Sequence, residues 1–436
     1  MKTKYAFSIL LFILLIVSRS HSDGFLKASG KFIVDGQNKQ IQLRGMGLGG
    51  WLLPEGYMVL TSGFADAFWQ MKNKINETVG AANADTFWTA YRKNFVTRKD
   101  IEQLSAWGFN SVRYVMHWEY FLNSNGTFRE EGFIITDSLL QWCAENKIYL
   151  IFDLHAAPGG QSANNISDYN PAFLSFWESE ANKFAAVKLW KELARRYKDE
   201  VWIGGYDLLN EPAWNLPNNN KDLRDIYVMI TDSIRSVDKN HLLFIEGNWY
   251  ATDFNGLAPA WDENMAWSFH KYWNGTDVGT INYLLTLRNE TNRPLWMGES
   301  GENSNAWFAE CIAMLEANNI GWSWWTYKKF ETVVGPLSVP ATPEYNALLK
   351  YWKGQASKPS AANAMKGLMG MAEGLKLGNC RFHPDVIDAM MRQPYSNSTK
   401  PFMPNSIPGI IYFTDYDLGS YNFAYKDIVY KNTDNA

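Results

Sequence analysis

Two glutamates lie at the ends of apolar runs that are far apart in the sequence. Glu211 belongs to the segment GYDLLNEP and Glu299 to the segment PLWMGESG. Cleavage of a glycosidic bond needs one carboxyl group that protonates the leaving oxygen and a second that meets the anomeric carbon. Taken alone, either glutamate is as typical of a surface carboxylate or a structural ion pair as it is of a catalytic residue. Together they predict a retaining glycosidase in which Glu211 is the acid/base and Glu299 the nucleophile, with carboxyl groups about 5–5.5 Å apart.

Polar or aromatic residues end several other apolar runs of the chain. In barrels of alternating strands and helices, the chemistry lies where the strands end and the loops begin. In a purely structural barrel, polar residues would be scattered over these positions. In an enzyme, polar and aromatic residues are expected at several strand ends, so that they meet at one site. We therefore expect substrate-binding residues at the following strand ends: Arg113, His155, Asn210, His270, Tyr272 and Trp325.

Arg113 and Asn210 have predicted roles beside the two glutamates. A guanidinium is always charged, so Arg113 can keep Glu299 ionised through a charge-assisted hydrogen bond. The alternative for Arg113 is a structural ion pair inside the barrel. The Asn210 amide can hold the 2-hydroxyl of the sugar in the transition state. Because neighbours on a regular strand point in opposite directions, this role requires the chain to turn there.

His270 and Tyr272 are two positions apart and therefore share one face of a strand. We expect His270 to tune Glu211 and the Tyr272 hydroxyl to orient Glu299. A core histidine with satisfied hydrogen bonds is the alternative for His270.

His155 and Trp325 complete the predicted pocket. His155 can donate a hydrogen bond to a sugar hydroxyl, or it can pack against Asp153 instead. Trp325 can form the floor on which the reactive sugar stacks. Trp324 is its rival for this role, because adjacent strand residues face opposite ways.

The order of apolar and amphipathic segments predicts the fold. Eight runs have strand length and are continuously apolar, as in strands buried on both faces: Ile41–Gly50, Asn110–His117, Tyr149–Ala157, Gly205–Glu211, His241–Gly247, Met265–Tyr272, Pro294–Ser300 and Ile320–Tyr327. Helical patterns alternate with them, as in Arg98–Trp107, Asp137–Asn146, Lys183–Tyr197, Leu223–Val237, Ile281–Asn289 and Ala306–Asn318. This order predicts an α/β fold, a (β/α)8 TIM barrel, with an open doubly wound sheet as the competing arrangement.

The remaining segments predict additions to the barrel. Residues 25–43 carry turn signals and predict a hairpin that closes the bottom of the barrel, and the aromatic-rich insertion 52–97 can wall one side of a cleft. Two short helices are expected within residues 361–392. We divide the chain into a signal peptide (1–22), a catalytic barrel (23–355), a helical extension with a linker (356–407) and the incomplete start of a β-rich module (408–436).

The amino-terminal segment and the composition restrict location and partners. Residues 1–22 combine two lysines, an apolar run and small residues, which is typical of a secretory signal, with an uncleaved anchor as the alternative. We expect a secreted protein, periplasmic in a bacterium, with no membrane association after cleavage. The net charge of −4 and the lack of a basic run argue against nucleic acid as a partner. Cys143, Cys311 and Cys380 allow at most one internal disulfide, and their spacing does not resemble a zinc site.

Seven segments resemble, in family order, those of glycoside hydrolase family 5: RGMGLGGW, GFNSVR, DLHAAPGG, LLNEP, FHKYW, MGESG and GWSWWTYKK. The resemblance covers residues 23–355 and implies the same acid/base, nucleophile and pocket residues as the argument from chemistry. It implies no metal or organic cofactor, because two carboxyl groups suffice for the reaction.

Finer resemblances suggest a substrate. DLHAAPGGQ and the WWTYKK ending are most similar to the exo-β-1,3-glucanase-like and related β-glucanase branches, whereas the insertion 52–97 does not match them. The segment IPGIIYFTDYDLGSYNFAYKD is similar to the opening of a family 6 carbohydrate-binding module, without its usual glutamate-rich stretch. We expect a monomeric enzyme that hydrolyses a β-glucan polysaccharide or oligosaccharide. Another glycan such as mannan, xyloglucan or a glycolipid, and a non-catalytic carbohydrate-binding barrel, are the alternatives.

Overall fold

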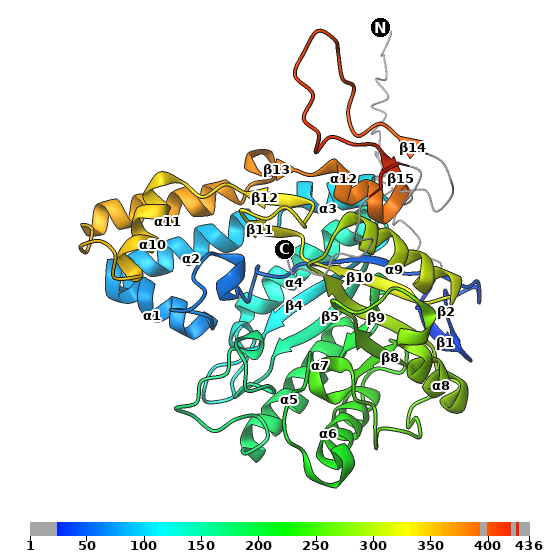
Figure 1. Cartoon of the computed structure of the whole chain (residues 1–436). Coiled ribbons are helices and arrows are strands. Elements are labelled where there is room, and N and C mark those ends of the chain that lie inside the picture. The colour runs from blue at the N-terminus through cyan, green and yellow to red at the C-terminus, as the bar shows by residue number, and fades with distance from the viewer. Residues whose placement is uncertain (1–23, 393–398, 420–423, 427–436) are drawn as a thin grey trace, which may run out of the picture.

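A closed barrel of parallel strands forms the centre of the molecule (Figure 1). The computed structural model describes residues 24–392, 399–419 and 424–426, so the predicted signal peptide and part of the predicted C-terminal module lie outside the described residues. Neighbouring strands follow the order β10-β3-β4-β5-β6-β7-β8-β9, and the pairing of β10 with β3 closes the ring. The predicted (β/α)8 barrel is therefore confirmed, and the open doubly wound sheet is excluded.

The barrel strands overlap the eight apolar runs that predicted them. Their bounds are β3 (Arg44–Gly47), β4 (Ser111–His117), β5 (Tyr149–Ala156), β6 (Ile203–Asp207), β7 (Leu243–Glu246), β8 (Met265–His270), β9 (Leu295–Gly301) and β10 (Gly321–Trp325). Almost every residue of these strands is buried, as expected for strands covered by helices on one side and by the barrel interior on the other.

Helices surround the barrel and extend it on one side. Their bounds are α1 (Phe68–Val79), α2 (Ala81–Phe95), α3 (Arg98–Trp107), α4 (Glu130–Glu145), α5 (Glu180–Tyr197), α6 (Pro217–Arg235), α7 (Asn248–Ala251), α8 (Asn282–Thr291), α9 (Asn305–Ala317), α10 (Pro343–Trp352), α11 (Ala361–Gly374) and α12 (Pro384–Ile387). Local sequence sets several of these ends. The hydroxyls of Ser179, Ser304 and Thr342 accept backbone N–H bonds at the starts of α5, α9 and α10, and Gly108 ends α3 in the left-handed conformation.

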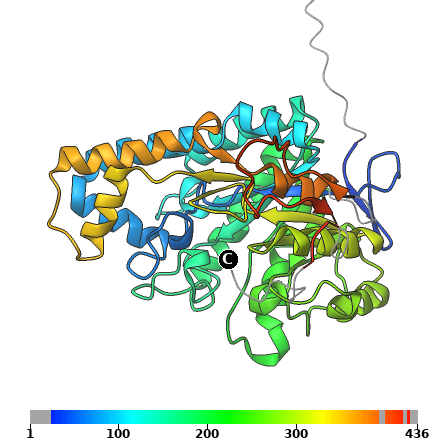
Figure 2. The ribbon, with the colours of Figure 1, turned by 45° about the horizontal axis from the view of Figure 1, so that its top comes forward.

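The insertion after β3 builds a helical cluster with the segment that follows the barrel. Helices α1 and α2 lie beside α10 and α11 in both views of the ribbon (Figures 1 and 2). Trp352 of α10 donates its indole N–H to Thr78 of α1, and Asn94 of α2 donates to the carbonyl of Ala372 in α11. The cluster also contacts the rim of the barrel, because Trp69 donates its backbone N–H to Asp168 in the loop after β5.

Short strands complete the described structure. The hairpin of β1 (Lys27–Ser29) and β2 (Phe32–Val34) lies at the amino-terminal end of the barrel strands, where Ala28 donates to Asn264 just before β8. Strands β11 (Lys328–Phe330), β12 (Leu337–Val339) and β13 (Arg381–Phe382) form a second small sheet, and β14 (Thr399–Lys400) pairs with β15 (Leu418–Gly419). The division into domains and the resemblance of residues 407–427 to a carbohydrate-binding module stay predictions.

The three cysteines are free, with Cys143 and Cys311 buried and Cys380 partly exposed. Among the described residues, no helix has both the length and the apolar character that crossing a membrane requires.

Candidate active site

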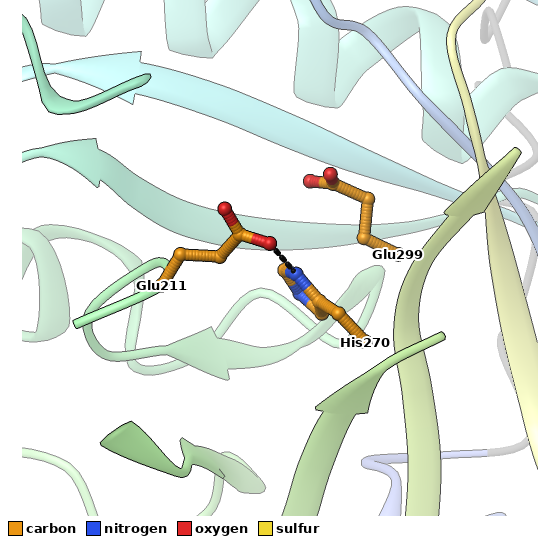
Figure 3. A group of neighbouring side chains, drawn as sticks. All are labelled: Glu211, His270 and Glu299. Atoms are coloured by element: carbon orange, nitrogen blue, oxygen red, sulfur yellow. Dashed lines mark hydrogen bonds and ion pairs between the residues drawn. The ribbon is translucent and has the colours of Figure 1, made fainter. Parts of the chain in front are cut away.

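The two glutamates singled out by the sequence meet at the carboxyl-terminal end of the barrel. Glu299 lies in β9, and Glu211 lies four residues beyond the end of β6. One carboxylate oxygen of each lies within 4.8 Å of the other, and Figure 3 shows the two side chains reaching towards each other from different elements. Glu211 is 8% exposed and Glu299 is 6% exposed. Both carboxyl groups are therefore accessible from the barrel mouth and shielded from bulk water.

The backbone turns sharply at Glu211. Its φ of 43° lies in the left-handed region, which is uncommon for residues other than glycine. This turn supplies the irregular geometry that the predicted role of Asn210 requires, because Asn210 and Glu211 no longer point to opposite faces of a regular strand. The Asn210 and Glu211 side chains both contact residues of the barrel, Arg113 and His270 respectively.

His270 and Tyr272 contact the two glutamates as predicted, although β8 ends at His270 and Tyr272 lies two residues beyond it. His270 Nδ1 lies 2.6 Å from Glu211 Oε1, and the Tyr272 hydroxyl donates a 2.6 Å hydrogen bond to Glu299 Oε1. The register of the strands explains this arrangement, since His270 of β8 pairs directly with Glu299 of β9 next to a bulge.

The pKa of His270 is raised well above its ordinary value. Burial alone would lower this pKa, but the carboxylates of Glu246, Glu299 and Glu211 outweigh burial. The raised pKa favours the imidazolium form of His270, held between carboxylates.

Arg113 is fully buried and connects Glu299 to a group of fully buried acidic residues. Arg113 donates a 2.9 Å hydrogen bond to Glu299 Oε2, as its predicted role requires. Its guanidinium also contacts three further buried carboxyl groups, so the alternative of a structural ion pair is present as well: Asp153 at 3.2 Å, Asp207 at 2.9 Å and Glu246 at 2.9 Å. Arg113 is thus both a partner of Glu299 and the central cation of the barrel interior.

Burial raises the pKa of Glu299, and the neighbouring Glu211 carboxylate raises it further. The positive charges of His270, Arg113 and His155 act in the opposite direction. The net effect is a raised pKa of Glu299, which these three cations moderate.

Asn210 and His155 lie beside this network. Asn210 Oδ1 accepts a 2.8 Å hydrogen bond from Arg113, and its amide nitrogen lies 3.3 Å from His155 Nε2. His155 Nδ1 lies 2.7 Å from Asp153 Oδ2, so His155 also makes the contact with Asp153 that was the alternative to its role in sugar binding. Gln161 holds both segments by donating to the main-chain oxygens of His155 and Asn210.

Trp325 lies in the site, and its neighbour Trp324 does not. The Trp325 ring stacks on His155 with centroids 5.2 Å apart and planes 3° apart, and its indole N–H donates to the Tyr57 hydroxyl at 2.7 Å. Trp324 points outward and packs against Phe308 of α9. Since Trp325 is only 3% exposed, its predicted stacking on the sugar stays a prediction.

The glycines of the segment RGMGLGGW make room for this tryptophan. A Cβ atom at Gly49 would lie 2.4 Å from the Trp325 ring, and one at Gly47 would lie 2.9 Å from it. Any larger residue at these positions would displace the ring.

The sequence argument did not assign four buried acidic residues to the site, although it named Asp153 as an alternative packing partner of His155. Asp153, Asp207 and Glu246 form the layer around Arg113, and Glu55 comes from the loop after β3. Glu246 ends the apolar run HLLFIEG, so the strand-end rule that identified Glu299 could also have found it. Glu55 follows no such rule, because it lies inside the insertion.

Glu55 is a third carboxyl group near the catalytic pair. It is 4% exposed and accepts a 3.0 Å hydrogen bond from Asn165. Burial raises its pKa to about 8, His155 opposes this shift, and the charges of Glu299, Glu211 and Glu302 add to it. Glu55 is therefore a neutral hydrogen-bond donor at neutral pH.

Glu211, His270 and Glu299 also have the spacing that could hold a metal ion, since their ligand atoms all lie within 4.8 Å of one another. His270 fits this poorly. Its Nδ1 lies against Glu211 and its Nε2 lies 3.2 Å from Glu246 Oε1, so both ring nitrogens face carboxylates. A protonated imidazole offers no lone pair to a metal.

A closed (β/α)8 barrel with two facing carboxyl groups at its catalytic end defines the class of glycoside hydrolases. Residues 72–331 match the family model described as cellulase (glycosyl hydrolase family 5), which covers more than half of the chain, so the chain belongs to this family.

Known relatives agree with the family and differ in what they act on. A β-xylosidase of Phanerodontia chrysosporium is 34% identical over 57% of this chain and 52% of that protein, so the chain spans about half the length of this relative. Endoglucanase C of Acetivibrio thermocellus is 24% identical over 54% of this chain and 85% of that enzyme. The structure of rutinosidase from Aspergillus niger shares the fold, with a TM-score of 0.54 at 17% identity over 67% of this chain and 92% of that one.

Proposed function

We propose that this protein is a secreted retaining glycosidase that cleaves β-glucosidic linkages of a β-glucan by double displacement. The observation that carries this proposal is the approach of Glu211 and Glu299 to within 4.8 Å, measured between carboxylate oxygens. Retaining enzymes hold their carboxyl groups about 5–5.5 Å apart, whereas inverting enzymes need about 6.5–9.5 Å to admit a water molecule. The spacing favours the retaining mechanism.

In the first step, a Glu299 oxygen forms a bond to the anomeric carbon while the bond from that carbon to the leaving oxygen breaks. Glu211 transfers its proton to the leaving oxygen, which departs as a hydroxyl group. The products of this step are a glycosyl ester on Glu299 and an ionised Glu211.

In the second step, Glu211 removes a proton from water, and the water oxygen attacks the anomeric carbon. The ester bond breaks, Glu299 leaves as a carboxylate, and Glu211 is protonated again. Two inversions at one carbon give net retention. If a sugar hydroxyl replaces water, the same step gives transglycosylation.

The neighbouring side chains support these steps. Arg113 and Tyr272 each hold one oxygen of Glu299, which fixes the carboxylate in a single orientation. The proposal assigns Asn210 and His155, which lie 3.3 Å apart beside this network, to the binding of sugar hydroxyls, and the neutral Glu55 can donate a further hydrogen bond to the substrate.

The choice of β-glucan as substrate has support from two sides. The segments DLHAAPGGQ and WWTYKK are similar to those of β-glucanase branches, and relatives include endoglucanases and probable glucan 1,3-beta-glucosidases. Because one relative is a β-xylosidase, a β-xyloside is the competing substrate. Secretion is supported by the composition of residues 1–22, and polysaccharide binding by the similarity of residues 407–427 to a carbohydrate-binding module.

Azide as an external nucleophile tests the two catalytic assignments separately. Glu211→Ala should yield a β-glycosyl azide, because azide then completes the second step on the intact ester. Glu299→Ala should yield an α-glycosyl azide, because azide replaces the missing nucleophile directly. Unchanged turnover in both variants would instead support a non-catalytic role for the glutamates and contradict the proposal.

The substrate is tested by product profiles on β-1,3-, β-1,4- and mixed-linkage glucans, with xylan, mannan and xyloglucan as comparison. We expect the highest reducing-end release from a β-glucan. Preferential cleavage of xylan or mannan would leave the mechanism intact and overturn the substrate.

A further inference from the structure

Glu246 is a fully buried carboxyl group at the end of β7, directly beneath the acid/base Glu211. With no exposed surface it cannot reach a substrate. Its two oxygens nevertheless contact three groups of the site from three different elements. This placement gives Glu246 the geometry of a residue that acts through its neighbours.

The first contact fixes the backbone of Glu211. The N–H of Glu211 donates a 2.6 Å hydrogen bond to Glu246 Oε2. Glu211 has a φ of 43°, a conformation that costs free energy for a residue with a side chain and persists where its surroundings hold it. A charge-assisted hydrogen bond to the strained residue itself supplies such a hold.

The second contact acts through His270. Glu246 Oε1 lies 3.2 Å from His270 Nε2, and His270 Nδ1 lies 2.6 Å from Glu211 Oε1. One imidazole ring therefore connects the Glu246 carboxylate to the Glu211 carboxyl group. A negative charge on Glu246 keeps the ring positively charged, and His270 and Arg113 together hold the pKa of Glu246 at about 2 against the effect of burial.

The third contact anchors Glu246 itself. Arg113 donates a 2.9 Å hydrogen bond to Glu246 Oε1, the same oxygen that faces His270. Tyr227 of α6 donates to the main-chain oxygen of Glu246 at 3.0 Å. Arg113 thus holds the carboxylate of Glu246, and Tyr227 holds its main chain.

We propose that Glu246 is the positioning residue of the acid/base: it holds the Glu211 main chain in its left-handed turn and sets the charge of the His270 ring that faces the Glu211 carboxyl group. This inference rests on the proposed role of Glu211 as acid/base. The titratable and charged groups around the Glu246–His270–Glu211 unit include Arg113 of β4, Asp153 of β5, Asp207 of β6, Glu299 of β9, Tyr227 of α6, Tyr272 after β8 and Glu55 of the loop after β3.

The test uses kcat/KM, which reports the first chemical step, on a series of aryl β-glucosides with leaving groups from good to poor. Aryl β-xylosides or β-mannosides replace them if the wild type prefers those sugars. A good leaving group departs without a proton, so loss of acid assistance affects only poor leaving groups. General acid catalysis contributes about 10²–10⁴-fold.

For Glu246→Gln we expect kcat/KM to fall about 10²–10³-fold for the poorest leaving group and less than about 10-fold for the best. The pH profile of kcat/KM should also change at the limb that reports Glu211. Glu246→Asp, which keeps the charge, should recover a larger part of the pH profile than Glu246→Gln. If the role of Glu246 were purely structural, kcat/KM would fall by the same factor for all substrates, and its pH profile would not change.

Asp207→Asn is the matched control. Asp207 is equally buried and also accepts a 2.9 Å hydrogen bond from Arg113, but the contacts to the Glu211 N–H and to His270 are made by Glu246. We expect this variant to affect good and poor leaving groups alike. The same leaving-group dependence in both variants would overturn the inference.

Glu211→Ala separates failure of this inference from failure of the proposed function. If Glu211→Ala retains activity on the best leaving group and Glu246→Gln does not show that pattern, the positioning role of Glu246 is wrong and the acid/base assignment stands. If Glu211→Ala itself shows no dependence on the leaving group, the proposed acid/base role is wrong, and the inference is overturned with it.

Discussion

The hydroxyl of Tyr272 donates a 2.6 Å hydrogen bond to Oε1 of Glu299, the oxygen that Arg113 leaves free. Arg113 holds the other oxygen of the same carboxylate at 2.9 Å. Both oxygens of the proposed nucleophile are therefore oriented before a substrate arrives. Preorganisation of this kind lowers the barrier, because no rearrangement is needed when the reaction begins.

Tyr272→Phe should lower kcat/KM about 10–100-fold, since a hydrogen bond to a charged group contributes about 1.5–3 kcal/mol. Thermal stability should change little. Tyr283→Phe, which alters a half-exposed tyrosine away from the glutamates, is the control and should keep wild-type kinetics. Wild-type kinetics in Tyr272→Phe would show that this hydrogen bond does not orient the nucleophile.

Arg113→Met should destabilise the fold by about 3–5 kcal/mol, because it leaves buried carboxyl groups without their cation. Urea unfolding at neutral pH measures this change. The control is Arg44→Met, which breaks a partly exposed ion pair with Glu316 and should cost less than about 1 kcal/mol. Equal losses in the two variants would mean that the buried cluster does not depend on Arg113.

Glu55→Gln should make stability less dependent on pH. The pKa of Glu55 is about 8 in the folded protein, against an ordinary value of 4.5. The unfolded chain therefore loses this proton near pH 4.5 while the folded protein keeps it, so folding stability falls as the pH rises from 4.5 to 8. The glutamine variant cannot ionise, so it avoids this loss.

Urea unfolding at pH 5 and pH 8 tests the Glu55 prediction. Relative to the wild type, Glu55→Gln should gain about 2–4 kcal/mol between these two pH values, at about 1.4 kcal/mol per pKa unit. Glu263→Gln, at a side chain that is 97% exposed, should follow the wild type. A parallel pH dependence in Glu55→Gln and the wild type would contradict the burial of an uncharged Glu55.

Much of the site follows from the sequence, because strand ends of a parallel barrel converge at one edge. Glu211, Glu299, Arg113, His155, Asn210, His270, Tyr272 and Trp325 all lie together there, although their functional roles stay predictions. Because adjacent strand residues face opposite ways, the sequence predicts that only one of Trp324 and Trp325 faces inward. Only the structure shows which one it is.

The remainder depends on contacts that no local pattern encodes. Glu55 reaches the site from an insertion, and its raised pKa arises from burial beside residues distant in sequence. Helices α1 and α2, which follow the first barrel strand, pack with α10 and α11, which follow the last one. Amphipathic periodicity cannot specify this pairing between segments distant in sequence. The bulge that brings His270 level with Glu299 is likewise a property of the closed sheet.

Gly49→Ala should impair the site through Trp325. The added Cβ atom would lie 2.4 Å from the Trp325 ring and 2.6 Å from the Thr326 hydroxyl, so the ring must move. We expect a stability loss of about 1–3 kcal/mol from overpacking, together with reduced kcat/KM. Gly378→Ala, where the space around the new Cβ atom is open, is the control for a glycine substitution. Unchanged activity in Gly49→Ala would mean that the position of Trp325 does not matter for turnover.

The most direct test of the proposed double displacement is the anomeric configuration of the first product, followed by proton NMR during hydrolysis of a β-glucan oligosaccharide. The proximity of the Glu211 and Glu299 oxygens, within 4.8 Å, predicts that the β-anomer forms first and that the α-anomer appears only later by mutarotation. Initial formation of the α-anomer would contradict the account, because it would require a single displacement by water.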